Sequence, residues 1–316
     1  MTKILIIQPI AKEGVKMLEE KGFEVKQLED HNIENIKKEV IDADAILVRT
    51  AEIPREVIKC GKKLKVIARH GVGVDNIDIE AATENGVYVT NAPTASDVSV
   101  AEHVLGLMIS LAKNIRKADI ALREGKFEVR NEYIGVELEG KTLGILGLGK
   151  IGRKVAIKAA KGFGMKIIGY DPFITQDNVD SVIEVTNSWE KVFKEADFIS
   201  LNLPLNDKTR GIVGKKEFKM MKKTAYIINC ARGPIVNEEE LIQALNKGLI
   251  AGAGLDVFTE EPPAKDNSLF RLNNTIVTPH MAAHTHASMI KMATHAAQGI
   301  IEVLSNKPPT WPVNKV

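Results

Sequence analysis

The stretch that decides the fold runs Leu143-Gly144-Ile145-Leu146-Gly147-Leu148-Gly149-Lys150-Ile151-Gly152. It combines an apolar strand pattern with a Gly-x-Gly-x-x-Gly turn, and a helical pattern follows. In such a turn Gly147 allows the tight bend, Gly149 lets a pyrophosphate approach the backbone, and Gly152 lets the helix pack closely on its strand. The anion would lie at the helix N-terminus, where unpaired N–H groups and the helix dipole favour negative charge. The stretch therefore predicts a dinucleotide-binding βαβ unit.

Asp171 extends this pattern and indicates which dinucleotide binds. A second apolar strand pattern, at 166–170, leads into Asp171, 19 residues beyond Gly152. A carboxylate in this place accepts hydrogen bonds from the ribose hydroxyls and repels a 2′-phosphate. The following Pro172-Phe173 provides no arginine that could accommodate such a phosphate. The sequence thus favours NAD over NADP.

Length and composition are those of a globular protein with two domains of ordinary size. The chain has 316 residues, 44% of them hydrophobic, and a formal charge of only +2. Nothing in this balance favours nucleic acid or a membrane as a partner. Met1-Thr2-Lys3 leads directly into an apolar strand pattern with no signal segment, and Cys60 and Cys230 make no disulfide framework. We therefore expect a cytoplasmic protein that binds neither nucleic acid nor a membrane.

A second α/β unit is expected ahead of the glycine turn, because that turn begins only near residue 143. Strand and helix patterns alternate there at short spacing, which is typical of a parallel, doubly wound sheet. The strand patterns lie at Ile4–Ile7, Phe23–Leu28, Ala45–Val48, Lys65–Ala68 and Val87–Thr90, and the helical patterns at about 11–21, 33–41, 54–60 and 78–85.

The rest of the chain supplies a connecting helix and more strands. Residues 98–123 predict one long, mostly apolar helix that joins the domains and could offer a subunit contact, although packing within one domain fits it equally well. A last helix is expected at about 286–304. Strand patterns that continue the nucleotide-binding sheet lie at Phe198–Leu201, Ala225–Asn229, Gly252–Asp256 and Ile276–Thr278.

Three side chains just past predicted strand ends could perform chemistry, since open α/β sheets bind ligands beyond the carboxyl ends of their strands. They are Arg232, Glu261 and His280. The arginine could bind a carboxylate and a carbonyl oxygen, the histidine could exchange a proton with that oxygen, and the glutamate could stabilise the charged imidazole. Taken singly, each could instead be an ion pair, a solvated charge or a capping residue.

Several motifs together resemble the D-isomer-specific 2-hydroxyacid dehydrogenases, and within them the phosphoglycerate dehydrogenase branch. They are the glycine turn, Asn-Cys-Ala-Arg-Gly at 229–233, Leu-Asp-Val-Phe-Thr-Glu-Glu-Pro-Pro at 255–263, Thr-Pro-His at 278–280, Arg-His-Gly-Val-Gly-Val-Asp-Asn at 69–76 and Val-Ala-Glu-His at 100–103. The resemblance implies two doubly wound parallel-sheet domains, with a Rossmann NAD-binding domain (98–285) inserted in a flavodoxin-like substrate domain (1–97 plus 286–316). It also implies a homodimer and a cleft that closes over the substrate.

The resemblance carries the family's functional residues onto this chain. The catalytic residues become Arg232, Glu261 and His280. The substrate carboxylate would be held by the amides of Val72 and Gly73. The cofactor contacts become Gly147, Gly149, Lys150, Ile151, Gly152, Asp171, Leu203, Pro204, Cys230, Ala231, Asp256, Ala282 and Ala283.

The expected activity is the NAD-dependent interconversion of a D-2-hydroxy acid and its 2-oxo acid. Arg49 and Arg69, beside His70, could bind a phosphate, which makes 3-phosphoglycerate the leading substrate and serine biosynthesis the expected role; both arginines could equally be structural. Hydroxypyruvate, glyoxylate or a lactate-type acid is the alternative substrate. An NAD-sensing corepressor that binds protein partners is an alternative of another class.

The sequence departs from the family pattern at four positions near the expected site, namely Ser96, Asn202, Ala282 and His70. His70 stands where a small residue is common, next to the substrate loop, and could alter substrate choice. Because the sequence ends at Val316, we expect neither a regulatory extension nor feedback control by serine. His280, His284 and His286 lack the glutamate of a zinc motif, so no metal is expected.

Overall fold

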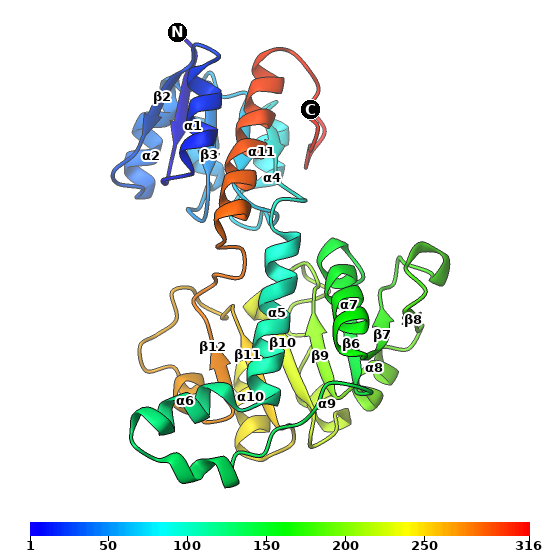
Figure 1. The fold of residues 1–316 in the computed structure, drawn as a ribbon. Coiled ribbons are helices and arrows are strands. Elements are labelled where there is room, and N and C mark those ends of the chain that lie inside the picture. The colour runs from blue at the N-terminus through cyan, green and yellow to red at the C-terminus, as the bar shows by residue number, and fades with distance from the viewer. The chain divides into compact units, whose positions relative to one another are not determined.

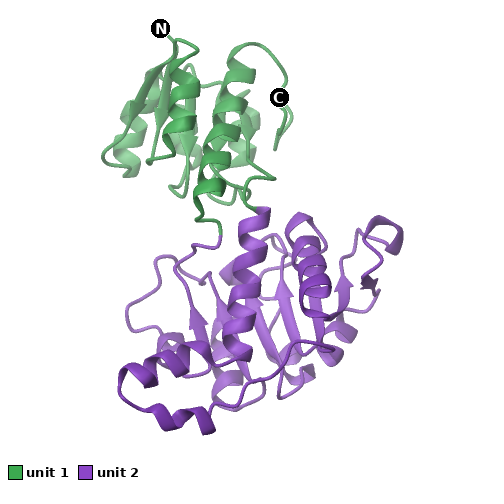
Figure 2. Ribbon diagram, viewed as in Figure 1, with its two compact units in different colours: residues 1–96, 283–316 green, residues 97–282 purple.

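The computed structural model describes residues 1–316 and divides into two compact units. Unit 1 comprises 1–96 and 283–316, and unit 2 comprises 97–282 (Figure 2). The breaks lie one and three residues before the domain boundaries predicted at 97/98 and 285/286. Unit 1 is therefore formed by two separate stretches of chain, with the whole of unit 2 inserted between them.

Unit 1 is built on a five-stranded parallel sheet with the order β2-β1-β3-β4-β5. This is the flavodoxin-like order that the sequence analysis expected, and it is confirmed. The strands are β1 (Lys3–Ile6), β2 (Glu24–Gln27), β3 (Ala45–Val48), β4 (Val66–Arg69) and β5 (Tyr88–Thr90). The helices are α1 (Lys12–Glu19), α2 (Ile33–Glu39), α3 (Arg55–Cys60), α4 (Ile79–Glu84) and α11 (His286–Leu304).

Alternation along the strands gives unit 1 a core on each face of its sheet. In β3, Ile46 and Val48 pack with α2, α3 and α4, whereas Ala45 and Leu47 pack with α1 and α11. Helix α11, from the C-terminal stretch, lies beside α1 and covers this second face (Figure 1). The last helix thus helps to bury the core on one face of the sheet.

Unit 2 is built on a seven-stranded parallel sheet with the order β8-β7-β6-β9-β10-β11-β12. Numbered from its first strand, this is the Rossmann order 3-2-1-4-5-6 with one further strand, and the predicted fold is confirmed. The strands are β6 (Thr142–Leu146), β7 (Lys166–Tyr170), β8 (Ile183–Val185), β9 (Phe198–Leu201), β10 (Tyr226–Asn229), β11 (Gly252–Leu255) and β12 (Thr275–Val277).

Unit 2 has helices on both faces of its sheet. They are α5 (Asp97–Ala112), α6 (Ile115–Arg123), α7 (Lys150–Phe163), α8 (Trp189–Glu195), α9 (Lys215–Met220) and α10 (Glu238–Asn246). In β6, Leu143 and Ile145 enter the core shared with α5 and α7, and Leu146 enters the core shared with α8, α9 and α10. The strand order reverses between β6 and β9, which is where doubly wound sheets bind their ligands.

The single long helix predicted over 98–123 is wrong: α5 ends at Ala112, and α6 begins at Ile115 after a bend of 62°. Asn114 adopts the left-handed conformation with φ 54°, and its backbone N–H donates to Leu111 O. This conformation ends the first helix. No single helix is long and apolar enough to cross a membrane, and α5 with α6 meets that description only as a bent pair. The apolar residues of α5 are buried in the core of unit 2.

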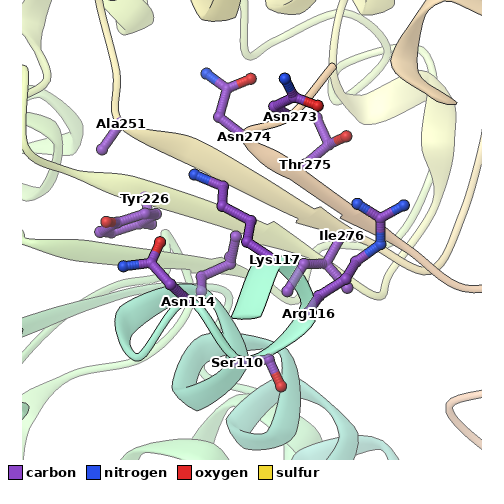
Figure 3. A pocket seen from close by; sticks show the side chains of 11 residues that line it. Ser110, Asn114, Arg116, Lys117, Tyr226, Ala251, Asn273, Asn274, Thr275 and Ile276 are labelled. Atoms are coloured by element: carbon purple, nitrogen blue, oxygen red, sulfur yellow. The ribbon is translucent and has the colours of Figure 1, made fainter. Parts of the chain in front are cut away.

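A small hollow lies at the amino ends of β10 and β12, where Tyr226 and Thr275 begin their strands. Figure 3 shows Asn114 and Lys117, from the bend between α5 and α6, beside it. Parallel sheets bind substrates and cofactors at their carboxyl ends. The hollow therefore lies at the opposite edge of the sheet from the residues that the sequence marks as functional.

Candidate active site

The glycine turn between β6 and α7 requires glycine for measurable steric reasons. Gly147 has φ 92°, and a Cβ there would lie 2.5 Å from Asn202 O. A Cβ at Gly152 would lie 2.0 Å from Gly147 O, so helix and turn are in direct backbone contact. A Cβ at Gly149 would meet open space, so this glycine faces a region that a ligand could occupy. The tight bend at Gly147 and the close helix contact at Gly152 are thus present, whereas the approach of a pyrophosphate at Gly149 stays a prediction.

The N-terminus of α7 is suited to a pyrophosphate. The helix runs for 14 residues from Lys150, and its N-cap Gly149 has no side chain to satisfy the first amides. The first N–H groups of a helix have no intrahelical acceptor, and the helix dipole adds positive potential there. Lys150 is exposed at this terminus and Ile151 is partly exposed. The amides, the open space at Gly149 and the lysine together fit the phosphates of a dinucleotide.

Asp171 is held at the end of β7 by two backbone amides. Its Oδ2 accepts from Leu148 N at 2.9 Å and its Oδ1 accepts from Phe173 N at 2.9 Å. Each carboxylate oxygen offers two lone pairs, so both can still accept from ribose hydroxyls. The fixed negative charge beside the glycine turn suits NAD and disfavours the extra phosphate of NADP.

His280 and Glu261 form a short hydrogen bond in unit 2. The imidazole Nδ1 lies 2.6 Å from Glu261 Oε2, and Glu261 Oε1 accepts from Phe258 N at 3.0 Å. The His280 side chain is 44% exposed, which leaves Nε2 accessible to a substrate. Burial opposes ionisation of Glu261, yet its pKa lies below the ordinary carboxyl value because the hydrogen bond and charge of His280 outweigh that effect. The pair is arranged to stabilise a protonated imidazole.

Asp256 organises the loop that carries His280. It is fully buried, and its carboxylate accepts from Thr278 Oγ1 at 2.6 Å, Met281 N at 2.9 Å and Ala282 N at 2.8 Å. Its own carbonyl accepts from His280 N at 2.8 Å. The sequence analysis listed Asp256 among the expected cofactor contacts, and the structure gives its carboxylate three internal donors. The resemblance named Asp256 and Ala282 as separate contacts, and the structure joins them directly.

Arg232 follows β10 and is fixed through its backbone. Its carbonyl accepts from Asn229 Nδ2 at 2.9 Å, and its guanidinium donates to Ala231 O at 2.7 Å. The next residue, Gly233, has no room for a side chain, because a Cβ would lie 1.9 Å from Phe258 O. Strand β10 and the loop that holds Glu261 are therefore in close backbone contact. Arg232, Glu261 and His280 thus follow three successive strands of one sheet, at its carboxyl edge.

Cys230 and the segment after β9 lie at the same carboxyl edge. Burial, with the charge of Asp256 as a smaller cause, raises the pKa of the Cys230 thiol well above its ordinary value, so the thiol is a poor nucleophile. Leu203 and Pro204 follow β9, and Leu203 contacts the core. The Asn202 amide nitrogen turns back onto Ser200, with both contacts at 3.1 Å. The Asn202 side chain therefore contacts the end of the strand that precedes it.

In unit 1, basic side chains gather beyond the carboxyl ends of β3 and β4. The Arg49 guanidinium donates to Pro9 O at 2.9 Å and lies 3.3 Å from His284 Nε2, and burial lowers its pKa. Arg69 donates to the carbonyl of His70. Sequence reasoning missed the residue that shapes this edge: Gln8 Oε1 accepts amides from Arg49, Thr50 and Ala51. The one feature of the sequence that could have pointed to Gln8 is its position just after an apolar strand pattern.

The loop at Gly71–Gly73 is held open by its neighbours. Gly71 has φ 151°, and its carbonyl accepts from Ala92 N at 2.8 Å. Asn91 Nδ2 donates to Val72 O at 2.6 Å, so the Val72 carbonyl is directed toward Asn91. The Val72 side chain is 36% exposed. This stretch of main chain is the one the sequence analysis expected to bind a carboxylate.

His70 is buried beside the basic cluster and is neutral at physiological pH. It is 3% exposed, and its Nε2 has no hydrogen-bond partner. Burial, followed by the charges of Arg49 and Arg69, lowers the pKa of His70 to about 4. The residue that departs from the family pattern thus adds an uncharged imidazole to unit 1.

Lowering the pH is expected to weaken folding through His70. The unfolded chain binds a proton near the ordinary value of 6.5, whereas the folded chain binds it only near about 4. The contribution of the neutral, buried His70 to the free energy of unfolding is therefore complete above pH 6.5 and is lost as the pH falls toward 4. These values imply a loss of about 2 kcal/mol between about pH 7.5 and about pH 5. Urea unfolding of the wild type and of His70→Gln at both pH values measures it; parallel losses in the two proteins would refute the assignment.

No three His, Cys, Asp or Glu side chains are grouped so that they could hold a metal ion. His284 lies next to Arg49, whereas His280 is paired with Glu261. The two imidazoles therefore have different partners.

The chain belongs to the D-isomer specific 2-hydroxyacid dehydrogenases. The NAD binding domain of that family matches residues 105–282, which cover most of unit 2 and include Arg232, Glu261 and His280. NAD is therefore the cofactor that this domain binds, in agreement with its Rossmann strand order.

Similar proteins extend the likeness over both units. The chain is 47% identical over 306 residues to D-3-phosphoglycerate dehydrogenase of Methanocaldococcus jannaschii, covering 96% of this chain and 58% of that protein. It thus spans little more than half the length of this relative. Among solved structures, the TT0316 protein of Thermus thermophilus has a TM-score of 0.92 at 31% identity, covering 99% and 100% of the two chains. D-lactate dehydrogenase of Aquifex aeolicus, complexed with NAD and lactic acid, has a TM-score of 0.90 at 27% identity, covering 100% of both.

Proposed function

We propose that the protein interconverts a D-2-hydroxy acid and its 2-oxo acid with NAD. The observation that carries this proposal is the 2.6 Å contact between His280 Nδ1 and Glu261, at the carboxyl edge of an NAD-binding sheet and with Arg232 on the same edge. A hydroxyl and a carbonyl differ by one proton and one hydride. The pair can exchange the proton, and the domain binds the hydride carrier.

The roles of the residues follow from their chemistry. NADH, when bound, supplies a hydride to C2 of the oxo acid. His280 donates the Nε2 proton to the carbonyl oxygen and takes it back in the oxidation direction. Glu261 stabilises the imidazolium and fixes the ring through Nδ1. The Arg232 guanidinium offers paired N–H donors to the substrate carboxylate and the developing alkoxide.

Unit 1 is proposed to bind the acid itself. The amides of Val72 and Gly73 are offered to the carboxylate, because neither Gly71 nor Gly73 has a side chain of its own to cover the main chain. The basic cluster of Arg49 and Arg69 favours a second anionic group on the substrate. Together with the phosphoglycerate dehydrogenase relative, this favours 3-phosphoglycerate over hydroxypyruvate, glyoxylate or lactate.

NADH oxidation with a panel of oxo acids tests the proposal. We expect turnover with 3-phosphohydroxypyruvate at a higher kcat/KM than with hydroxypyruvate, glyoxylate or pyruvate. Arg49→Gln should raise KM for the phosphorylated acid about 10-fold or more and leave hydroxypyruvate nearly unchanged, since a charge-assisted contact would be lost only with phosphate. Arg55→Gln, which removes a surface ion pair with Glu84, is the matched control.

An NAD-sensing corepressor is the competing function of another class. It would bind NADH and turn over none of the acids, so the same panel separates the two. The proton-exchanging pair has no purpose in a sensor, and this observation favours the dehydrogenase.

We further propose that the protein is a homodimer, assembled through the segment 115–136. Six of its sixteen exposed large apolar side chains lie in these 22 residues, from Ile115 to Val136. Phe127 is 63% exposed and Ile134 is 80% exposed. Exposed apolar side chains concentrated in one segment are typical of an interface, and in a homo-oligomer a second copy presents the same surface.

Sedimentation equilibrium measures the oligomeric state directly. We expect a dimer for the wild type and a monomer for the double variant Phe127→Glu, Ile134→Glu, because two buried charges would oppose association. Phe173→Glu, at an 88% exposed apolar residue outside the segment, should remain dimeric. A monomeric wild type would contradict the proposal.

A further inference from the structure

Helix α5 presents two polar side chains to the loop that carries His280. Ser99 and His103 are four residues apart and lie on one face of the helix. Ser99 Oγ donates to Ala282 O at 2.6 Å, and His103 Nε2 lies 3.0 Å from Thr278 Oγ1. The two contacts flank His280 in the sequence. Neither side chain has a role in the chemistry proposed above.

The hydrogens of this network can be assigned from its donors and acceptors. Asp256 accepts a backbone amide on each carboxylate oxygen and is 2.6 Å from Thr278 Oγ1. An ionised carboxylate only accepts, so the single Thr278 hydroxyl proton points to Asp256. The Thr278 oxygen must then accept from His103, which places a proton on Nε2. His103 Nε2 is also 3.5 Å from Asp256 Oδ1, so its partial positive charge faces the buried carboxylate.

The loop needs this support because His280 adopts an unfavourable backbone conformation. His280 has φ 48°, in the left-handed region that non-glycine residues seldom occupy. Such a residue persists only where its surroundings hold it. Here Asp256 binds the amides of His280, Met281 and Ala282, and α5 in turn holds Asp256 through Thr278 and holds Ala282 through Ser99.

We infer that Ser99 and His103 are positioning residues for the proposed reaction: their face of α5 sets the loop that aims the His280 imidazole at Glu261 and at the substrate. The inference rests on the proposed function for its kinetic consequence. The geometry that it explains, the 2.6 Å contact between His280 and Glu261, exists without substrate.

The decisive comparison is His103→Phe against His103→Gln. Phenylalanine fills the space without a donor, whereas glutamine retains an N–H that can reach Thr278. We expect His103→Phe to lower kcat about 10- to 100-fold, because a small displacement of a proton donor has effects of this size. The dissociation constant of NADH, followed by fluorescence, should change less than about 2-fold, and His103→Gln should recover most of kcat. Ser110→Ala, on the same helix but away from this loop, is the control.

A second readout does not depend on turnover. The Nδ1 proton of His280, held in a short hydrogen bond to Glu261, should give a downfield proton NMR signal in the unliganded protein. It should shift or broaden in His103→Phe and in Ser99→Ala and be retained in His103→Gln and Ser110→Ala. If the wild type turned over no acid, the proposed function would fail while this signal still tested the loop.

Two results would overturn the inference. One is wild-type kcat in His103→Phe together with an unchanged His280 signal. The other is equal impairment of the phenylalanine and glutamine variants, which would assign His103 to packing alone. Should His103→Phe fail to fold, Ser99→Ala carries the same test, since it removes the contact to Ala282 and leaves Asp256 and Thr278 in place.

Discussion

His280→Ala is expected to reduce kcat for oxo-acid reduction by about 10²- to 10⁴-fold, the range associated with loss of a general acid. The variant removes the imidazole that is hydrogen-bonded to Glu261 at the carboxyl edge of the NAD-binding sheet. Its binding of NADH should stay close to that of the wild type, because the glycine turn and Asp171 are untouched. Steady-state kinetics with the best acid of the panel, together with NADH fluorescence titration, measures both quantities.

Glu261→Gln provides the graded comparison for His280→Ala. Glutamine keeps a hydrogen-bonding group near Nδ1 but removes the negative charge that favours the imidazolium. The loss in kcat should therefore be smaller than in His280→Ala. His31→Ala, which alters an exposed histidine in unit 1, should behave as the wild type. Wild-type turnover in His280→Ala would remove the proposed mechanism, whereas equal losses in His280→Ala and Glu261→Gln would show that the charge supplies most of the effect.

The activity that depends on the His280–Glu261 pair is expected to fall at low pH. The pKa of Glu261 is lowered, so its carboxylate remains ionised somewhat below the ordinary carboxyl range. The support that it gives to the imidazolium is present above that range and is lost as the pH falls through the lowered value. The folding stability that depends on His70 already decreases when the pH falls below 6.5. The loss of folding stability and the loss of activity are therefore expected in different pH ranges.

The strand patterns and the glycine turn allowed most of the fold to be predicted, because both are local. Apolar runs such as Ala45–Val48 coincide with strands, and the spacing from Gly147 to Asp171 is that of a complete βαβ unit. The break between α5 and α6 was not predictable in this way. The apolar pattern continues through Asn114, and only its left-handed backbone ends the helix.

The candidate site was predictable as a set of residues but not as a network. Arg232, Glu261 and His280 could be proposed because polar residues just past strand ends converge on one edge of a parallel sheet. The contact between His103 and Thr278 joins residues 175 positions apart, and no local pattern indicates it. Likewise, nothing in the sequence shows that the first partners of the Asp256 carboxylate are the amides of Met281 and Ala282.

Gly152→Ala tests the close contact on which the whole cofactor site depends. The added Cβ would lie 2.0 Å from Gly147 O and 3.1 Å from Ile145 Cγ2, so either the start of α7 or the glycine turn must move. Forcing a side chain into such a contact costs about 1–3 kcal/mol or more. The amides that would bind the pyrophosphate lie in that first turn. We therefore expect a lower melting temperature and a dissociation constant for NADH raised about 10-fold or more, since each 1.4 kcal/mol is a factor of ten.

Gly162→Ala is the matched control, because it makes the same substitution in the same helix without a steric conflict. Gly162 lies in the last turn of α7, and a Cβ there would meet nothing within 4 Å. Alanine is favoured over glycine within a helix by roughly 0.5–1 kcal/mol, so this variant should be slightly more stable and should bind NADH as the wild type does. If both variants bound NADH equally well, the contact between Gly152 and Gly147 would not determine the site, and the role assigned to the third glycine of the turn would be wrong.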